Sequence, residues 1–328
     1  MADTTVSRTA PRSTSSGGPR GRVTGTRSKR SGGPGGRRTL TAYLFLAPFL
    51  ILFLVFVAAP AVWGIWISLH SWNPLLPIHP FVGLSNYINL FIPGSLTSGD
   101  FWLSMGATAI FTVCSVPFLV VVPLLIAVLL NQRLRGGTVF RAIFFAPYVL
   151  GVAVIGVAWR YLLDPQNGVI NNLLDGIGIT QNIPWTVDVP WAWISLVGVT
   201  VWWISGFNMV IILAGLKGIN AELYEAAGID GAGAIRKFWS VTLPGLRPVM
   251  AFVTTTTILS SANMFGQSYL LTKGAPGHST RTAIMYIADE GLSQNQMGAA
   301  SAMSYVLFAV LAIISIINFR LQSRTSGD

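Results

Sequence analysis

Two apolar stretches, residues 191–216 and 250–271, carry hydroxyl, amide and aromatic side chains at helical spacing. Hydroxyls and amides can pair with the hydroxyl groups of an uncharged polyol, and an aromatic face can cover its CH-bearing side. The candidate solute-path residues are Trp203, Phe207, Thr257, Ser260, Ser261, Asn263 and Met264, with Thr200, Asn208 and Gln267 beside them. The same residue types fill helix–helix contacts in lipid, so packing is the alternative role for each of them.

The apolar stretches of the chain contain almost no charge, which narrows both the solute and the energy source. Arg160, at the end of its stretch, is the one residue in them with a permanent charge. Proton-coupled and sodium-coupled carriers usually keep carboxylates or histidines inside the membrane to bind the coupling ion. A phosphate or carboxylate solute would call for Arg, Lys or helix N-termini. The sequence therefore predicts a neutral solute and an energy source outside the spans.

The chain shows no catalytic or metal-binding set of residues. His70, His79 and His278 lie at or beyond the ends of the apolar stretches, and Cys114 is the lone cysteine. There is no G-x-x-x-x-G-K-[ST] sequence to hold a nucleotide. We therefore expect no enzymatic activity, no catalytic or metal site and no cofactor in this chain, so that ATP and Mg²⁺ would be bound by a separate subunit.

The composition is that of an integral membrane protein. Of 328 residues, 52% are hydrophobic and 10% are charged, and the mean hydropathy is +0.62. At about twenty apolar residues per span, an all-α polytopic protein with six transmembrane helices is expected. The predicted spans are residues 42–69, 103–130, 143–161, 191–216, 250–271 and 299–319. Prolines inside them are tolerated where neighbouring groups satisfy the carbonyls that they free.

Basic residues fall in alternate connections between the predicted spans. The connections after the second, fourth and sixth spans contain Arg133, Arg135, Arg141, Lys217, Arg236, Lys237, Arg247, Arg320 and Arg324. The other connections carry mainly acidic residues. Because cytoplasmic loops are enriched in Lys and Arg, both termini are predicted to lie in the cytoplasm.

The connection between the fourth and fifth spans is polar and partly helical. Asn220 can cap a helix whose early turns carry Glu222 and Glu225, where carboxylates suit the positive end of the helix dipole. Glycines then interrupt the helix, and a second short helix is expected to end before Pro244. The connection is therefore predicted to be a helix-turn-helix loop on the cytoplasmic membrane surface.

This loop resembles the EAA loop of binding-protein-dependent ABC importer permeases, written EAA-x3-G-x9-I-x-L-P, with Val241 in place of the isoleucine. The resemblance implies a type I (MetI-like) permease bundle over residues 39–328, whose coupling loop at residues 217–248 docks on a cytosolic ATPase. The coupling residues that it implies are Glu225, Ala226, Ala227, Gly231, Leu243 and Pro244. An ordinary amphipathic surface helix is the alternative.

Three further blocks resemble the carbohydrate (maltose/glycerol-3-phosphate-type) permeases of that class. They read PFVGLSNYINLF, DPQNGVINNLLDGIG and LLTKGAPGHSTR, with Ala275 in place of a glycine in the last block. In the family these loops form the vestibule onto which a sugar-loaded binding protein docks. Similarity to the maltose-type permease also implies sugar contacts near Trp203, Phe207, Thr257, Ser261 and Met264. Where that family shows amides, this chain has Ser261 and Met264, so the sugar or the chain that holds it can differ.

Residues 1–38 are rich in Ser, Thr, Gly, Pro and Arg and nearly free of large apolar side chains, which predicts a disordered basic cytoplasmic tail. Without interleaved aromatic residues for base stacking, a topological role is favoured over nucleic-acid binding. We expect a subunit of the bacterial cytoplasmic membrane that takes a neutral sugar or polyol from an extracytoplasmic binding protein and moves it by alternating access. The expected partners are two cytosolic ATPase subunits and a second permease. We expect the second permease to be a related but distinct chain, so that the two permeases form a heterodimer; a homodimer with a copy of this chain is the alternative. A sugar carrier or channel not coupled to ATP is the alternative.

Overall fold

The computed structural model describes residues 36–132, 135–179 and 181–325. The chain divides into two compact units, Met1–Val57 and Ala58–Asp328. The described residues form helices, with one isolated bridge between His70 and Phe81 and no strand among them, which confirms the all-α class. The prediction of a disordered tail falls mainly on residues 1–35, which lie outside the described residues. Helix α1 begins at Gly36, three residues before the predicted start of the membrane domain at residue 39.

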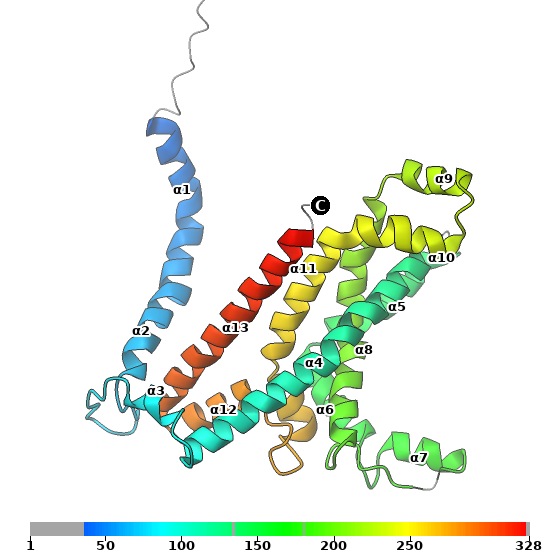
Figure 1. Cartoon of the computed structure of the whole chain (residues 1–328). Helices are drawn as coiled ribbons and strands as arrows, with labels where there is room; N and C mark the ends of the chain where they lie inside the picture. The colour runs from blue at the N-terminus through cyan, green and yellow to red at the C-terminus, as the bar shows by residue number, and fades with distance from the viewer. Residues whose placement is uncertain (1–35, 133–134, 180, 326–328) are drawn as a thin grey trace, which may run out of the picture. The chain divides into compact units, whose positions relative to one another are not determined.

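The helices differ widely in length (Figure 1). The longer ones are α1 (Gly36–Phe53), α2 (Ala59–Ser68), α4 (Leu96–Asn131), α5 (Gly137–Val149), α6 (Val152–Leu162), α8 (Trp191–Lys217), α11 (Leu243–Ala262) and α13 (Met297–Thr325). The shorter ones are α3 (Ser85–Asn89), α7 (Val169–Gly176), α9 (Ala221–Ile229), α10 (Ala234–Lys237) and α12 (Ala283–Ala288). Single π-helical turns are η1 (Leu54–Ala58), η2 (Phe238–Thr242), η3 (Ser268–Thr272) and η4 (Asp289–Ser293).

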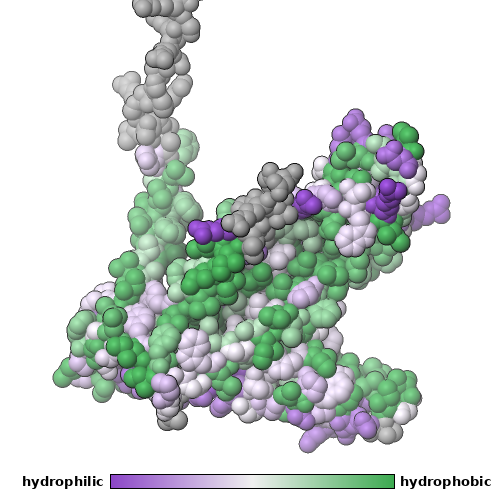
Figure 2. All heavy atoms as spheres, viewed as in Figure 1, coloured by the Kyte–Doolittle hydropathy of each residue, from purple (hydrophilic) through white to green (hydrophobic). Residues whose placement is uncertain are grey.

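Four helical segments of the described chain are long and apolar enough to cross a membrane, and α5 with α6 makes a fifth if that bent pair is one span. The four segments are Tyr43–Ser68, Thr97–Asn131, Trp191–Lys217 and Met297–Arg320. Figure 2 shows apolar side chains along the helices of the second unit and polar ones gathered at its two ends. The third and fifth predicted spans are therefore not single continuous apolar helices.

The third predicted span breaks between α5 and α6, which meet at 93°. Gly151 at the break has φ of 37°, a backbone conformation that favours glycine. The fifth predicted span breaks after Ala262, where α11 ends, and the helix resumes at residue 266 and leads into η3. Helix α11 itself is less apolar than a typical span because four consecutive threonines and Arg247 lie within it.

The two broken segments cross each other at glycines. A Cβ on Gly156 of α6 would lie 2.6 Å from Cβ of Leu270, and a Cβ on Gly266 would lie 2.6 Å from Cγ2 of Val152. Such distances leave no room for a side chain, so each glycine permits the close approach. We call this contact the α6–η3 crossing.

Three helices, α4, α8 and α11, pack around the main apolar core. Leu130, Met209 and Leu246, one from each helix, are fully or almost fully buried together toward the α9 end. A second core beside the α6–η3 crossing contains Phe111 and Leu196. Where these side chains would otherwise meet water, their burial stabilises the fold by about 25 cal/mol per Å². Within lipid, the helices are held together instead by close van der Waals packing.

The loop between α8 and α11 forms the predicted helix-turn-helix. Asn220 caps α9 through its side-chain oxygen, which accepts a hydrogen bond from the backbone N–H of Glu222 at 3.1 Å. Gly231 follows the C-cap of α9 with φ of 74°. Its N–H donates to the carbonyl of Gly228 at 3.1 Å, and the N–H of Ala232 donates to the carbonyl of Ala227 at 2.9 Å. This pair of bonds is a Schellman motif, in which a glycine at the left-handed position ends the helix.

The second half of the loop agrees with the prediction in part. Pro244 lies in the first turn of α11, as predicted. The short helix before it does not end there, because α10 continues through η2 directly into α11. The hydroxyls of Tyr224 and Thr242, 3.0 Å apart, tie α9 back onto η2.

Candidate functional site

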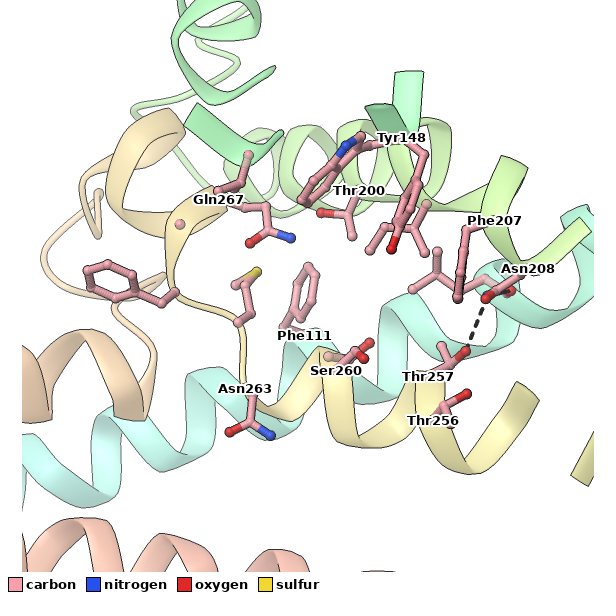
Figure 3. A pocket seen from close by; sticks show the side chains of 18 residues that line it. Phe111, Tyr148, Thr200, Phe207, Asn208, Thr256, Thr257, Ser260, Asn263 and Gln267 are labelled. Atoms are coloured by element: carbon pink, nitrogen blue, oxygen red, sulfur yellow. Dashed lines mark hydrogen bonds between the residues drawn. The ribbon is translucent and has the colours of Figure 1, made fainter. Parts of the chain in front are cut away.

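A cavity of about 350 Å³ lies where α4, α8 and α11 meet the two helix breaks (Figure 3). We call it the solute pocket. All seven candidate solute-path residues line it. Phe111, Tyr148, Val152, Thr200, Asn208 and Gln267 are also among its lining residues. None of the described residues that line it is charged at neutral pH, which matches the prediction of an uncharged path.

One wall of the solute pocket is aromatic. The ring of Tyr148 stacks on that of Phe207 with centroids 4.7 Å apart and lies 6.5 Å from that of Trp203. Tyr148 is brought there because α5 ends one residue later, at the bend before α6. A flat aromatic surface of this kind suits the CH-bearing face of a sugar ring.

The opposite wall carries hydroxyl and amide groups. They are positioned by a hydrogen bond to a backbone carbonyl that a proline in α4 leaves without a helical partner. Pro123 has no N–H, so the carbonyl of Leu119 in α4 loses its helical partner. The side chain of Asn208 in α8 replaces it, since Nδ2 donates to that carbonyl at 2.8 Å. The same nitrogen donates to Oγ1 of Thr257 in α11 at 3.2 Å. One buried amide therefore connects three helices beside the pocket.

Asn208→Leu is expected to destabilise the folded chain by about 2 kcal/mol, because it strands the buried carbonyl of Leu119. Pro123→Ala restores an N–H for that carbonyl. The double variant is therefore expected to lose much less stability on replacing Asn208 than the single variant does. Thermal unfolding of the four chains in one detergent measures this coupling. Equal losses in both backgrounds would contradict the assigned partner.

Two buried polar groups in the pocket have no hydrogen-bond partner within the part of the chain that the structure describes. They are Oγ1 of Thr200 and Nε1 of Trp203, both on α8. Thr200 is only 1% exposed, and its side chain points toward the cavity in Figure 3. Buried polar groups are rarely left unpaired, so both groups are candidates to bond a solute once the neighbouring side chains move to uncover them.

Thr200→Val keeps the shape of the side chain and removes the hydroxyl. We expect uptake to fall about fivefold, the equivalent of about 1 kcal/mol for one hydrogen bond, with no decrease in thermal stability. Initial uptake rates and melting temperatures of the same preparation measure both effects. Unchanged uptake would show that the hydroxyl does not contact the solute.

The predicted solute-path residues do not all face the cavity in the same way. Figure 3 shows Ser260 beside the cavity, whereas Asn263 points away from it. Nδ2 of Asn263 donates to the carbonyl of Leu259 at 2.8 Å and so serves the end of α11. Ser261 accepts a hydrogen bond from Ser115 of α4 at 3.2 Å. It therefore both joins α11 to α4 and lines the cavity. The sequence interpretation missed Phe111 and Tyr148, since helical spacing alone did not indicate which faces of α4 and α5 meet α8.

The coupling residues lie at one end of the second unit, away from the solute pocket. Glu225 and Ala226 on α9 are exposed, and Gly231 follows α9 in the Schellman turn. Ile229, Ile235 and Trp239 nearby are 88%, 78% and 64% exposed. This end of the second unit therefore carries exposed apolar side chains together with the exposed carboxylate of Glu225.

At the opposite end, a buried arginine closes the loop before α12. Arg281 is 7% exposed, and its Nη2 lies 3.2 Å from Oδ2 of Asp100. Its guanidinium lies 4.6 Å from the ring centre of Tyr286. Burial, reinforced by Glu290 and Asp100, raises the pKa of Tyr286 to about 12. Burial and the neighbouring carboxylate of Asp289 raise the pKa of Glu290 above its ordinary value. The cluster anchors this loop to α4.

Residues 91–327 match the family described as binding-protein-dependent transport system inner membrane component. The chain belongs to this family. It is therefore a permease subunit of an ABC importer, as the coupling loop predicted, and not the ATPase. Membership of the family decides against the alternative of a carrier or channel that does not use ATP.

Other permease proteins resemble the chain over most of its length. The arabinooligosaccharides transport system permease protein AraP of Bacillus subtilis is 34% identical over 87% of this chain and 90% of that protein. The trehalose/maltose transport system permease protein MalF of Thermococcus litoralis is 33% identical over 84% of this chain and 91% of that protein. A bacterial ABC transporter involved in the import of the acidic polysaccharide alginate has a chain of the same fold, with a TM-score of 0.73, 23% identity and coverage of 88% of this chain and 96% of that one.

Proposed function

We propose that this permease translocates a neutral sugar or related polyol. The observation that carries the proposal is the solute pocket, which combines an aromatic wall, hydroxyl and amide groups and no charged lining residue. Stacking on Tyr148 and Phe207, with hydrogen bonds from Thr200 and Trp203, suits a sugar ring. The relatives are named for the transport of arabinooligosaccharides, trehalose/maltose and lactose. These names support a neutral sugar as the solute.

The energy is proposed to enter through the coupling loop. Glu225, Ala226 and Ala227 of α9, with Gly231, would dock on a cytosolic ATPase, and Leu243 and Pro244 would transmit the movement into α11. Two ATPase subunits would bind the ATP and Mg²⁺. A second permease, distinct from this chain, would complete the path, and an extracytoplasmic binding protein would deliver the sugar. Closure of the ATPases would then open the path outward by alternating access.

The proposed orientation places both termini in the cytoplasm of a bacterial cell, with the chain in the cytoplasmic membrane. Lys217, Arg236 and Lys237 lie at the α9 end of the second unit, and α5, which carries Arg141, also starts there (Figure 1). This distribution supports a cytoplasmic coupling loop because basic residues favour that side. No role with nucleic acid is proposed.

The test is uptake of a panel of labelled sugars in cells that contain or lack this chain. Arabinotriose, maltose and lactose represent the neutral candidates, and galacturonate represents a charged one. We expect uptake of at least one neutral sugar to require both this chain and a working ATPase subunit. Dependence of only the charged sugar would overturn the neutral-solute proposal. Uptake that survives an inactive ATPase would overturn the proposed route of energy transfer.

A further inference from the structure

A second cavity, of about 650 Å³, lies at the end of the second unit opposite α9 and α10. It opens between the last turn of α6 and η3, and we call it the distal crevice. Its polar lining comes from Arg160, Tyr161, Asp164, Tyr269 and Lys273. None of these residues lines the solute pocket, so the crevice is a separate site.

The distal crevice and the solute pocket adjoin the same α6–η3 crossing. Phe265, which lines the solute pocket, stacks on Tyr269, which lines the crevice, with ring centroids 5.2 Å apart. Leu270, which contacts Gly156 at the crossing, also lines the crevice. A solute that moves from this end toward the solute pocket would therefore meet the crevice before it passes the crossing.

The charged groups of the crevice are not used to bind one another. Within the described residues, Arg160 and Lys273 form no ion pair. Oδ1 of Asp164 accepts hydrogen bonds from the N–H groups of Gln166 at 3.0 Å and Asn167 at 2.9 Å, which leaves its second oxygen available. Lys273 has φ of 55°, a conformation that usually favours glycine, so its side chain is held at this position at a cost in backbone strain.

We infer that the distal crevice is a second subsite for a neutral sugar, engaged before the sugar passes the α6–η3 crossing. The inference rests on the proposed function. Arg160 and Lys273 would donate hydrogen bonds to sugar hydroxyls, and the free oxygen of Asp164 would accept one. The exposed rings of Tyr161 and Tyr269 would cover the apolar face of the sugar. The carboxylate of Asp164 offsets part of the positive charge of Arg160 and Lys273, and a carboxylate ligand is the competing occupant that the experiment distinguishes.

The experiment measures how sugars slow the reaction of a cysteine in the crevice, in cells that contain the complete importer. Val157→Cys and Met285→Cys are two reporters, each in a Cys114→Ser chain, because both residues line the crevice and neither is assigned a contact with the sugar. His278→Cys is the matched control, because His278 is an exposed residue in the adjoining loop, outside the crevice lining. The reagent is a methanethiosulfonate that does not cross membranes. Arabinotriose, maltose, lactose and galacturonate are added in turn at tens of millimolar.

We expect the neutral sugar that the importer takes up to slow the labelling of both reporters at least threefold, with no effect on His278→Cys. Three results would overturn the inference: no sugar slows labelling, galacturonate alone slows it, or the binding protein slows it equally with and without sugar. These results differ from failure of the proposed function. That failure would appear in the uptake assay, as uptake of only the charged sugar or as uptake independent of the ATPase, and the labelling experiment measures neither.

Discussion

Glu225→Ala is expected to leave the chain folded and to reduce ATPase co-purification and sugar uptake at least tenfold. The side chain of Glu225 is exposed on α9, so its loss changes the stability of the chain by about 0.5 kcal/mol or less. Its proposed role is contact with the ATPase, where loss of a desolvated charge pair costs at least 2 kcal/mol. Affinity capture of the complex and initial uptake rates measure the two effects.

Glu222→Ala is the matched control, because Glu222 is an exposed carboxylate on the same helix that already accepts a hydrogen bond from Nδ2 of Asn220 at 3.0 Å. It should retain the ATPase. A further pair of variants tests whether Gly231 acts by ending α9 or by contacting the ATPase. Gly231 has φ of 74°, and a Cβ added there would meet nothing within 4 Å. Gly231→Asn should preserve docking better than Gly231→Val, since Asn tolerates the left-handed conformation. Full docking of Glu225→Ala would remove α9 from the coupling mechanism.

Gly206→Ala is expected to destabilise the chain by about 3 kcal/mol or more and to abolish its accumulation in the membrane. A Cβ on Gly206 of α8 would lie 2.1 Å from the carbonyl oxygen of Phe144 and 2.8 Å from Cα of Phe145. Both are backbone atoms of α5, so no side-chain rotation relieves the contact. The helices would have to separate, and with them the aromatic wall that Tyr148 and Phe207 form.

Gly198→Ala on the same helix is the control. A Cβ there would meet nothing within 4 Å, so the variant should be neutral or more stable by up to about 1 kcal/mol. Membrane content by immunoblot and thermal unfolding in detergent compare the two chains. Equal stability of Gly206→Ala and Gly198→Ala would show that α5 and α8 do not approach as closely as described.

Much of the fold follows from hydropathy and local chemistry, but the helix breaks do not. The Asn220 cap and the position of Gly231 depend on neighbours within one or two turns, and both were predictable. The bend at Gly151 lies inside a continuously apolar segment, so hydropathy carries no sign of it. At the second break, the run from Ser260 to Gln267 is polar for a span, but the sequence does not say whether such a run lines a cavity or ends a helix.

The solute pocket was predictable from one side only. Residues on α8 and α11 could be proposed because both helices flank a recognisable loop and carry hydroxyl and aromatic groups at helical spacing. Tyr148 reaches the pocket only because of the bend after α5, and Asn208 is fixed by the carbonyl that Pro123 frees four residues away in α4. These are contacts between segments distant in sequence. No local pattern indicates them.

The absence of charged side chains among the described lining of the solute pocket has a consequence for energetics. A neutral sugar that passes these residues carries no net charge through the electric field across the bilayer. Each unit charge would otherwise gain or lose about 2.3 kcal/mol per 100 mV. Collapse or reversal of the membrane potential should therefore not change the free energy of sugar passage through the solute pocket. The work of accumulating the sugar against its gradient would then come from ATP hydrolysis by the cytosolic subunits.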